Sequence, residues 1–180
     1  MPWTFQIKNK VRFSEADVDK HAEEYRFNCG PSAICAALNL TPDELRPNLC
    51  DFEKKGYTNP TMMNNILTGL KAKWKLVYRG DGAKVMPFTD AMKLIRVQWA
   101  GPWTEPGAHH MARYRHTHWI AMQSNEIFDV NAVGAGNYDG WLPHHVWATK
   151  LVPWLIKNCE PKTANGNWWP THVIEVERAG

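Results

Sequence analysis

The most continuous apolar stretch of the chain is a run of small and apolar residues at positions 32–38. Gly30 and Pro31 stand directly before it. Proline is favoured in the first turn of a helix, because the N–H that it lacks would have no partner there. The pattern predicts a buried helix that begins at Pro31 and ends near Asn39.

Two further helices are predicted in the first half of the chain. Residues 41–44 read Thr-Pro-Asp-Glu, a capping box with proline at the first helical position, so a short helix is expected from there to about Pro47. The next helix begins at Pro60, with Asn59 or Thr61 as its cap. Its apolar residues fall on one face at helical spacing: Met62, Ile66, Leu67 and Leu70.

After Gly69 the apolar residues follow the shorter repeat of β-strands. The segments that fit a strand are 74–78, 94–99, 117–122, 127–130 and 171–176. The third and fourth of these are joined through 123–126 as a hairpin. Helical pieces are expected around 89–93, from Pro143 to position 150, and again from Pro153. Helices followed by antiparallel strands predict an α+β fold rather than a repeating βαβ architecture.

The length of the chain indicates the number of domains, and its net charge bears on which partners it can bind. A chain of 180 residues is long enough for one domain, residues 1–180, with its own hydrophobic core. The formal net charge is +3, from 21 basic and 18 acidic residues spread along the chain, which is too mild to indicate a nucleic-acid partner. No signal peptide is visible, and no apolar run approaches the roughly 20 residues of a membrane span. We therefore expect a cytoplasmic protein with no membrane partner, whose cysteines are thiols.

Cys29 is the first residue that suggests chemistry, because it stands at the start of the predicted helix. A thiol at that place is exposed to the positive end of the helix dipole and to unpaired backbone N–H groups. Both favour the thiolate and lower the pKa of the cysteine, which is how a nucleophile is activated. The alternative is that Cys29 is a small core residue, the usual environment of a free cysteine.

The predicted hairpin supplies a base and its partner. A cysteine nucleophile needs a base within hydrogen-bond reach, and a third polar group usually orients that base. His118 lies on the first strand, while Asp129 and Asn131 share one face of the second. If 123–126 form a four-residue loop, His118 lies opposite Asn131, whereas a shift of two residues or a bulge favours Asp129. Both remain candidates for the third position.

Three runs, in this order along the chain, resemble the papain-like cysteine peptidases: Asn28–Ala33, His118–Ala121 and Ile127–Asn131. The likeness is nearest to the bacteriocin-processing peptidase branch and to small uncharacterised phage and prophage proteins, and its motifs span roughly residues 20–135. In that superfamily the cysteine opens a central helix, and the other two residues come from successive strands of an antiparallel sheet. The resemblance implies a papain-like α+β fold with a helical N-terminal part and a triad of Cys29, His118 and Asp129.

One position departs from the pattern of that family. Papain-like enzymes usually carry a glutamine about six residues before the cysteine, whose amide donates a hydrogen bond to the oxyanion. Here Glu23 stands at that position, and a carboxylate cannot donate unless it is protonated. The oxyanion hole is therefore expected in the region of Glu23 and Asn28, with the donor from Asn28, Gln98 or another group, or else the site is impaired.

The resemblance implies thiol acyl transfer on a peptide or protein substrate. The leading reaction is hydrolysis of a peptide or isopeptide bond, with deamidation or transamidation through the same thioester as close relatives. No cofactor is implied, and no metal is expected, because the eight histidines show neither Cys-x-x-Cys nor His-Glu-x-x-His spacing. The alternative from a different class is a non-catalytic papain-like phage accessory protein that binds and inhibits a host protein.

Overall fold

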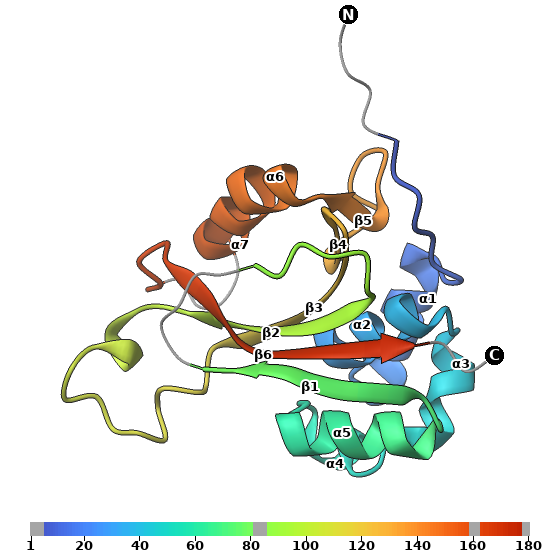
Figure 1. The fold of residues 1–180 in the computed structure, drawn as a ribbon, viewed down its shortest axis with the longest axis horizontal. Helices are drawn as coiled ribbons and strands as arrows, with labels where there is room; N and C mark the ends of the chain where they lie inside the picture. Colours follow the sequence, from blue (N-terminus) through green and yellow to red (C-terminus); the bar gives the residue numbers. More distant parts are fainter. Residues whose placement is uncertain (1–5, 81–85, 159–162, 178–180) are drawn as a thin grey trace, which may run out of the picture.

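The first helices precede all the strands, and a second helical segment lies between the last two strands of the chain (Figure 1). The computed structural model describes residues 6–80, 86–158 and 163–177. Its first helices are α1 (Glu15–Tyr25), α2 (Cys29–Leu38), α3 (Pro42–Leu45), α4 (Phe52–Lys55) and α5 (Pro60–Gly69). The strands are β1 (Lys73–Arg79), β2 (Lys93–Trp99), β3 (Thr117–Gln123), β4 (Glu126–Val133), β5 (Asp139–Pro143) and β6 (Trp168–Glu177). The predicted α+β class is confirmed.

The strands form one six-stranded sheet in the order β1-β6-β2-β3-β4-β5. Every strand pair among the described residues is antiparallel, as the sequence predicts. Strands β2 and β3 pair along most of their length, with Val97 opposite His118. Strands β3 and β4 pair only near their hairpin turn, from Gln123↔Glu126 to Ala121↔Phe128. Beyond that point the two strands are free to separate.

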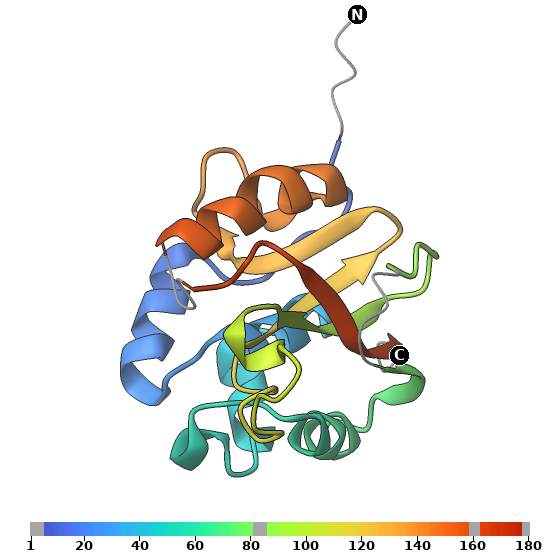
Figure 2. The same ribbon diagram turned by 90° about the vertical axis from the view of Figure 1, so that its left-hand side faces the viewer.

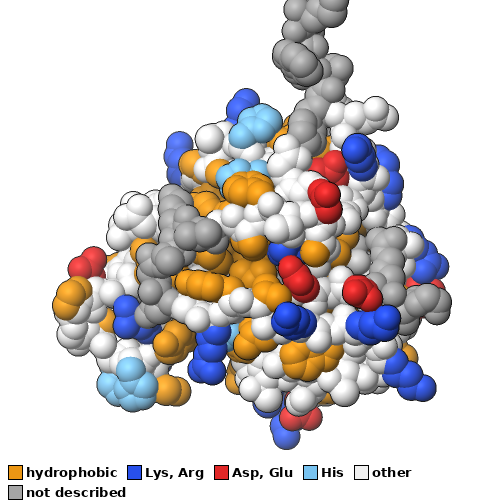
Figure 3. Space-filling model, viewed as in Figure 1, with side chains coloured by type: hydrophobic (Ala, Val, Ile, Leu, Met, Phe, Trp, Pro, Cys, Tyr) orange, Lys and Arg blue, Asp and Glu red, His pale blue; other side chains and the backbone are white. Residues whose placement is uncertain are grey.

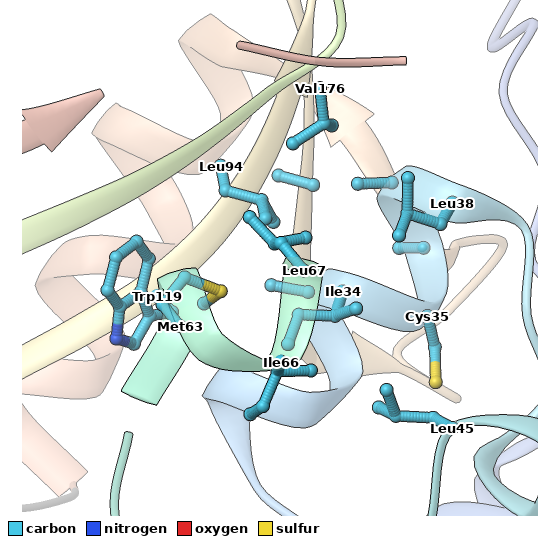
Figure 4. Close-up of a cluster of buried hydrophobic side chains, with 14 of the residues drawn as sticks. Ile34, Cys35, Leu38, Leu45, Met63, Ile66, Leu67, Leu94, Trp119 and Val176 are labelled. Atoms are coloured by element: carbon cyan, nitrogen blue, oxygen red, sulfur yellow. The ribbon is translucent and has the colours of Figure 1, made fainter. Parts of the chain in front are cut away.

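Both faces of the sheet are covered by helices (Figure 2). On one face α2 packs against β2, β3, β4 and β6, and α5 against β1. Figure 4 shows this core, in which Ile34 of α2, Leu67 of α5 and Leu94 of β2 meet. The other face is covered by α6 (His144–Val146), a π-helical turn (Trp147–Leu151) and α7 (Val152–Asn158). Within α2 every residue after Cys29 is buried, as expected for a helix that is apolar on all sides.

Helix α2 begins at Cys29, two residues before the predicted start at Pro31. Asn28 caps it, and the carbonyl of Asn28 accepts the first helical hydrogen bond from the Ser32 N–H at 3.0 Å. A proline is tolerated anywhere in the first turn, since the N–H groups there have no helical partner. The helix ends at Leu38, with Asn39 in the left-handed conformation, close to the predicted end.

The other predicted elements are confirmed in part. The capping box of Thr41 and the Asn59 cap of α5 are both present. The helical piece expected at 89–93 is wrong, because positions 89–92 are irregular and Lys93 begins β2. Residues 141–143 belong to β5, and the helical segment that follows runs from 144 to 158 without a break at Pro153. A wider π turn just before Pro153 gives the proline ring room that a regular helix would not.

The surface of the described residues is mixed. Figure 3 shows hydrophobic side chains in the middle of the face seen in Figure 1, with Lys, Arg, Asp and Glu distributed around them. Among the described residues, none of the helices has the length and apolar character needed to cross a membrane.

A close approach at Gly30 fixes the first turn of α2 against the loop before α5. A Cβ added at Gly30 would lie 2.2 Å from Thr58 Oγ1 and 2.7 Å from Thr58 Cβ. We expect Gly30→Ala to lower the free energy of unfolding by about 1–3 kcal/mol, the usual cost of overpacking a core. Urea denaturation measures this change.

The control for Gly30→Ala is Gly69→Ala, because the nearest atom to a Cβ there is 3.4 Å away. Gly69→Ala should be neutral or slightly stabilising, since alanine is the better helix former. In a Thr58→Gly background, where the clashing atoms are gone, Gly30→Ala should lose most of its effect. Equal destabilisation in both backgrounds would contradict the steric explanation.

Candidate active site

Cys29 is the first residue of α2, and its neighbour Asn28 holds the start of the helix in place. Asn28 Oδ1 accepts a hydrogen bond from the Gly30 N–H at 3.3 Å, and Asn28 Nδ2 donates to the Gly56 carbonyl at 3.0 Å. These bonds tie the first turn of α2 to the end of α4. The Cys29 side chain is half-buried at the positive end of the helix dipole.

His118 lies on β3 beside Cys29, where β3 and β4 have separated. Since the ladder between these strands stops at Ala121↔Phe128, the first half of β3 is not paired with β4. Helix α2 packs against both strands. Cys29 and His118 line the same pocket, and each shifts the pKa of the other. The structure therefore brings together the thiol and the imidazole that the sequence placed on separate elements.

The His118 imidazole pairs with Asp129 rather than with Asn131. His118 Nε2 and Asp129 Oδ2 are 2.9 Å apart. The hairpin register, if continued, would place position 131 opposite His118. However, β4 is irregular here, and its pairing with β5 shifts between Phe128 and Val133. A bulge of this kind changes where side chains point, and Asn131 instead donates to Asp129 Oδ1 from its backbone N–H at 3.0 Å and its Nδ2 at 2.9 Å.

The thiol and the imidazole change each other's pKa. Burial raises the pKa of the Cys29 thiol, but the charge of His118, a hydrogen bond from His118 and one from the Trp119 N–H outweigh burial and lower it. Burial lowers the pKa of His118, but the charges of Asp129 and Cys29 and hydrogen bonds to both raise it well above its usual range. Both shifts favour a thiolate paired with an imidazolium at neutral pH.

Trp147 donates a hydrogen bond to Asp129, and the sequence analysis did not identify Trp147 as part of the site. Asp129 is fully buried, and its Oδ2 also accepts a hydrogen bond from Trp147 Nε1 at 2.9 Å. Burial raises the pKa of Asp129, but the charge of His118 and hydrogen bonds from His118, Trp147 and the Asn131 N–H lower it. The carboxylate thus stays ionised inside the protein. A tryptophan N–H is a donor only, so Trp147 suits a buried acceptor.

Trp147→Phe removes this donor and keeps most of the packing. We expect the free energy of unfolding to fall by about 1.5–3 kcal/mol, the usual contribution of a hydrogen bond to a charged group. Urea denaturation at pH 7 provides the measurement. The matched control is Trp141→Phe, because Trp141 is equally buried and its Nε1 has no hydrogen-bond partner in the described part of the chain. Equal losses in the two variants would contradict the role of the Trp147 N–H.

Two pockets open on either side of Cys29, and Asn28 lines both. The first, about 430 Å³, is lined by Phe27, Trp99, His118, Val130, Asn131 and residues of α7. The ring of Trp99 stacks on the imidazole of His118, with centroids 6.0 Å apart and planes 27° apart. The second pocket, about 580 Å³, lies between the Tyr57–Asn59 segment and the loop before β3. An extended chain that crosses Cys29 would therefore have room on both sides.

Of the residues expected around the oxyanion, Asn28 lies in the site and Glu23 does not. Glu23 is exposed on α1 and lines neither of the pockets that contain Cys29. The Gln98 amide is buried at the end of β2, where Nε2 donates to the carbonyls of Trp99 and His116. Asn28 Nδ2 carries two hydrogens, of which Gly56 takes one. Within the described part of the chain, the second hydrogen and the Cys29 backbone N–H have no acceptor, so both can donate beside the thiol.

The described residues contain no cluster of side chains that could bind a metal ion. Within 6–80, 86–158 and 163–177, no three His, Cys, Asp or Glu side chains lie close enough together to hold an ion. His109 and His110 pack on each other with ring centroids 4.6 Å apart, and His144 packs edge-on against Phe88. Cys29, Cys35 and Cys50 are free thiols, while Cys159 lies outside the described residues.

A scan against protein-family models, a search of curated proteins and a search of solved structures each found no match to this chain.

Proposed function

We propose that this protein is a cysteine-nucleophile acyl-transfer enzyme, with a papain-like fold, that hydrolyses a peptide or isopeptide bond. The observation that carries this proposal is the placement of three side chains at the start of a helix. Cys29 and His118 line one pocket and shift each other's pKa, and His118 pairs with Asp129 at 2.9 Å. An activated nucleophile, a base and a group that orients the base are the parts that such chemistry requires. Their order along the chain matches the resemblance described for the sequence.

The proposed reaction begins with attack of the Cys29 thiolate on the acyl carbon of the substrate. Because Nε2 of His118 faces Asp129, Nδ1 is the nitrogen left to serve the thiol and the leaving group. His118 gives its proton to the departing amine, and a thioester on Cys29 remains. Water then attacks the thioester while His118 accepts a proton, which releases the acid and restores the thiolate. Asp129 holds the imidazole in this orientation and stabilises its positive charge.

The negative oxygen of the tetrahedral intermediate needs donors in a fixed place. We assign this role to the Cys29 backbone N–H and to the second Nδ2 hydrogen of Asn28. Each donor of an oxyanion hole lowers the activation free energy by about 3 kcal/mol. In this assignment Glu23 has no catalytic part, so the glutamine expected at that position is replaced by the residue directly before the cysteine. Deamidation and transamidation would use the same thioester with a different leaving group or acceptor.

Product analysis with a broad substrate set tests the proposed reaction. Wild type and Cys29→Ala are incubated separately with a proteome-derived peptide library and with a native bacterial lysate, and products are identified by mass spectrometry. We expect new chain termini, isopeptide cleavage or amide-to-acid conversions that appear only with wild type. If neither substrate set gives a product that depends on Cys29, the catalytic proposal is wrong, and a binding function that survives Cys29→Ala becomes the better account.

A further inference from the structure

The second pocket beside Cys29 contains a buried arginine that pairs with no carboxylate of the described residues. Arg96 projects from β2 and is only 7% exposed. Its Nη2 donates to the Tyr114 carbonyl at 3.5 Å, and its Nε has no hydrogen-bond partner among the described residues. Burial lowers the pKa of Arg96, and interactions with Tyr114 and Cys29 oppose this effect. A buried guanidinium that no carboxylate of the described residues pairs with is costly to maintain, so its presence calls for an explanation.

Arg96 lies between two adjoining pockets that carry positive charge. It lines the pocket of about 580 Å³ that contains Cys29 and Arg115, and also a neighbouring pocket of about 800 Å³ that contains Arg79 and His172. No Asp or Glu is among the described residues that line either pocket. Burial and the charges of Arg96 and Arg79 lower the pKa of His172 to about 4. The local potential therefore favours an anion.

The rim of the Cys29 pocket is apolar and exposed. Met111 and Tyr114, on the loop between β2 and β3, are 63% and 51% exposed, and Tyr57 across the pocket is 56% exposed. This loop, residues 100–116, projects from the sheet at the left of Figure 1. Exposed aromatic and methionine side chains around a pocket are typical of a surface that binds another molecule. An apolar rim above a buried guanidinium suits a peptide segment that carries a negative charge.

We propose that Arg96 binds a carboxylate of the substrate directly beside Cys29, so that the enzyme prefers an acidic peptide. This inference rests on the proposed function, since it names the substrate class of that site. A guanidinium presents paired N–H donors that match a carboxylate, and the unpaired Nε lies on that fork. The carboxylate comes either from an acidic side chain or from the C-terminus of the substrate. Arg96 is a specificity residue here and takes no part in bond making.

Two alkylating reagents of nearly equal size but different charge test the role of Arg96. Iodoacetate is an anion and iodoacetamide is neutral, so the ratio of their reaction rates with Cys29 reports the local charge. We expect Arg96→Gln to lower the iodoacetate to iodoacetamide ratio on the order of tenfold, and Arg96→Lys to lower it less. The control Arg12→Gln removes an arginine that pairs with Glu44 outside both pockets, and it should leave the ratio within about twofold.

The source of the carboxylate is tested with wild type and short peptides. One peptide carries internal glutamates and an amidated C-terminus, and the other is neutral except for a free C-terminal carboxylate. Protection of Cys29 from iodoacetamide by the first peptide indicates side-chain recognition, and protection by the second indicates recognition of the chain end. The protection experiment uses wild type only. It therefore still tests carboxylate binding if the melting curve of Arg96→Gln shows that this variant does not fold.

Two results would overturn the role of Arg96. One is an unchanged reagent ratio in a folded Arg96→Gln variant, and the other is protection by neither peptide at millimolar concentration. Failure of the proposed function looks different, because Cys29 would then react slowly with neutral iodoacetamide in wild type as well. The reagent ratio can still be measured in that case.

Discussion

His118→Ala is expected to slow the alkylation of Cys29 by iodoacetamide at pH 6 by roughly 30-fold or more. In wild type, His118 lowers the pKa of Cys29 through its charge and its hydrogen bond, against the opposing effect of burial. Without the imidazole, burial acts almost alone, and the thiol returns to or above the usual cysteine value of about 8.5. At pH 6 less than about 1% of such a thiol is ionised, while the lower nucleophilicity of a low-pKa thiolate offsets part of the difference.

The pH profile of the alkylation rate checks the cause. The midpoint of the rise should lie at lower pH in wild type than in His118→Ala, and the two rates should converge at high pH, where both thiols are ionised. His145→Ala serves as the control, because His145 is exposed and lines neither pocket around Cys29. A His118→Ala profile that coincides with wild type would show that the imidazole does not activate the thiol.

Asp129→Ala is expected to lower the free energy of unfolding by about 3–5 kcal/mol at pH 5–6. Asp129 is fully buried and accepts hydrogen bonds from His118, Trp147 and Asn131, so its removal leaves several buried donors without a partner. For a domain of this size the loss corresponds to a melting temperature about 10 °C lower. Asp19→Ala, on the exposed surface of α1, should change the melting temperature little.

The destabilisation by Asp129→Ala should depend on pH with a definite sign. The pKa of Asp129 is lowered in the folded protein, so its contribution is complete above about pH 4, the unfolded value, and is lost as pH falls through the folded pKa. The pKa of His118 is raised, so its contribution is complete below about pH 6.5 and is lost as pH rises through the folded pKa. The difference between wild type and variant should therefore be largest near pH 5–6. A difference that is constant from pH 3 to pH 9 would contradict an ion pair.

The sequence predicted helix starts correctly where a capping side chain close in sequence determines them. Thr41 and Asn59 cap their helices through side chains that are close in sequence, so a short window contains the needed information. Strand β5 was missed because Gly140 has a positive φ of 99° and its neighbours resemble a loop, while pairing with β4 makes it a strand. Long-range pairing of this kind is not visible in a short window.

The candidate site could be predicted as a set of residues but not as a geometry. Cys29 and His118 were identified by residue type and order, and the structure places both in the lining of one pocket. The choice between Asp129 and Asn131 depended on a bulge in β4 that no residue pattern announced. Trp147 and Arg96 were missed for another reason, since each is buried by contacts with distant parts of the chain. The catalytic roles of Cys29, His118 and Asp129 and the binding role of Arg96 remain predictions.

Competitive alkylation measures whether Cys29 is an activated nucleophile. Wild type is exposed to limiting iodoacetamide at pH 6, and the labelling of each cysteine is followed by mass spectrometry of its tryptic peptide. Cys50 is exposed, whereas Cys35 is buried and burial raises the pKa of its thiol. We predict that half-buried Cys29 reacts at least tenfold faster than exposed Cys50, because the charge of His118 lowers the pKa of the Cys29 thiol. Labelling of Cys29 at or below the rate of Cys50 would show that the Cys29 thiol is not activated.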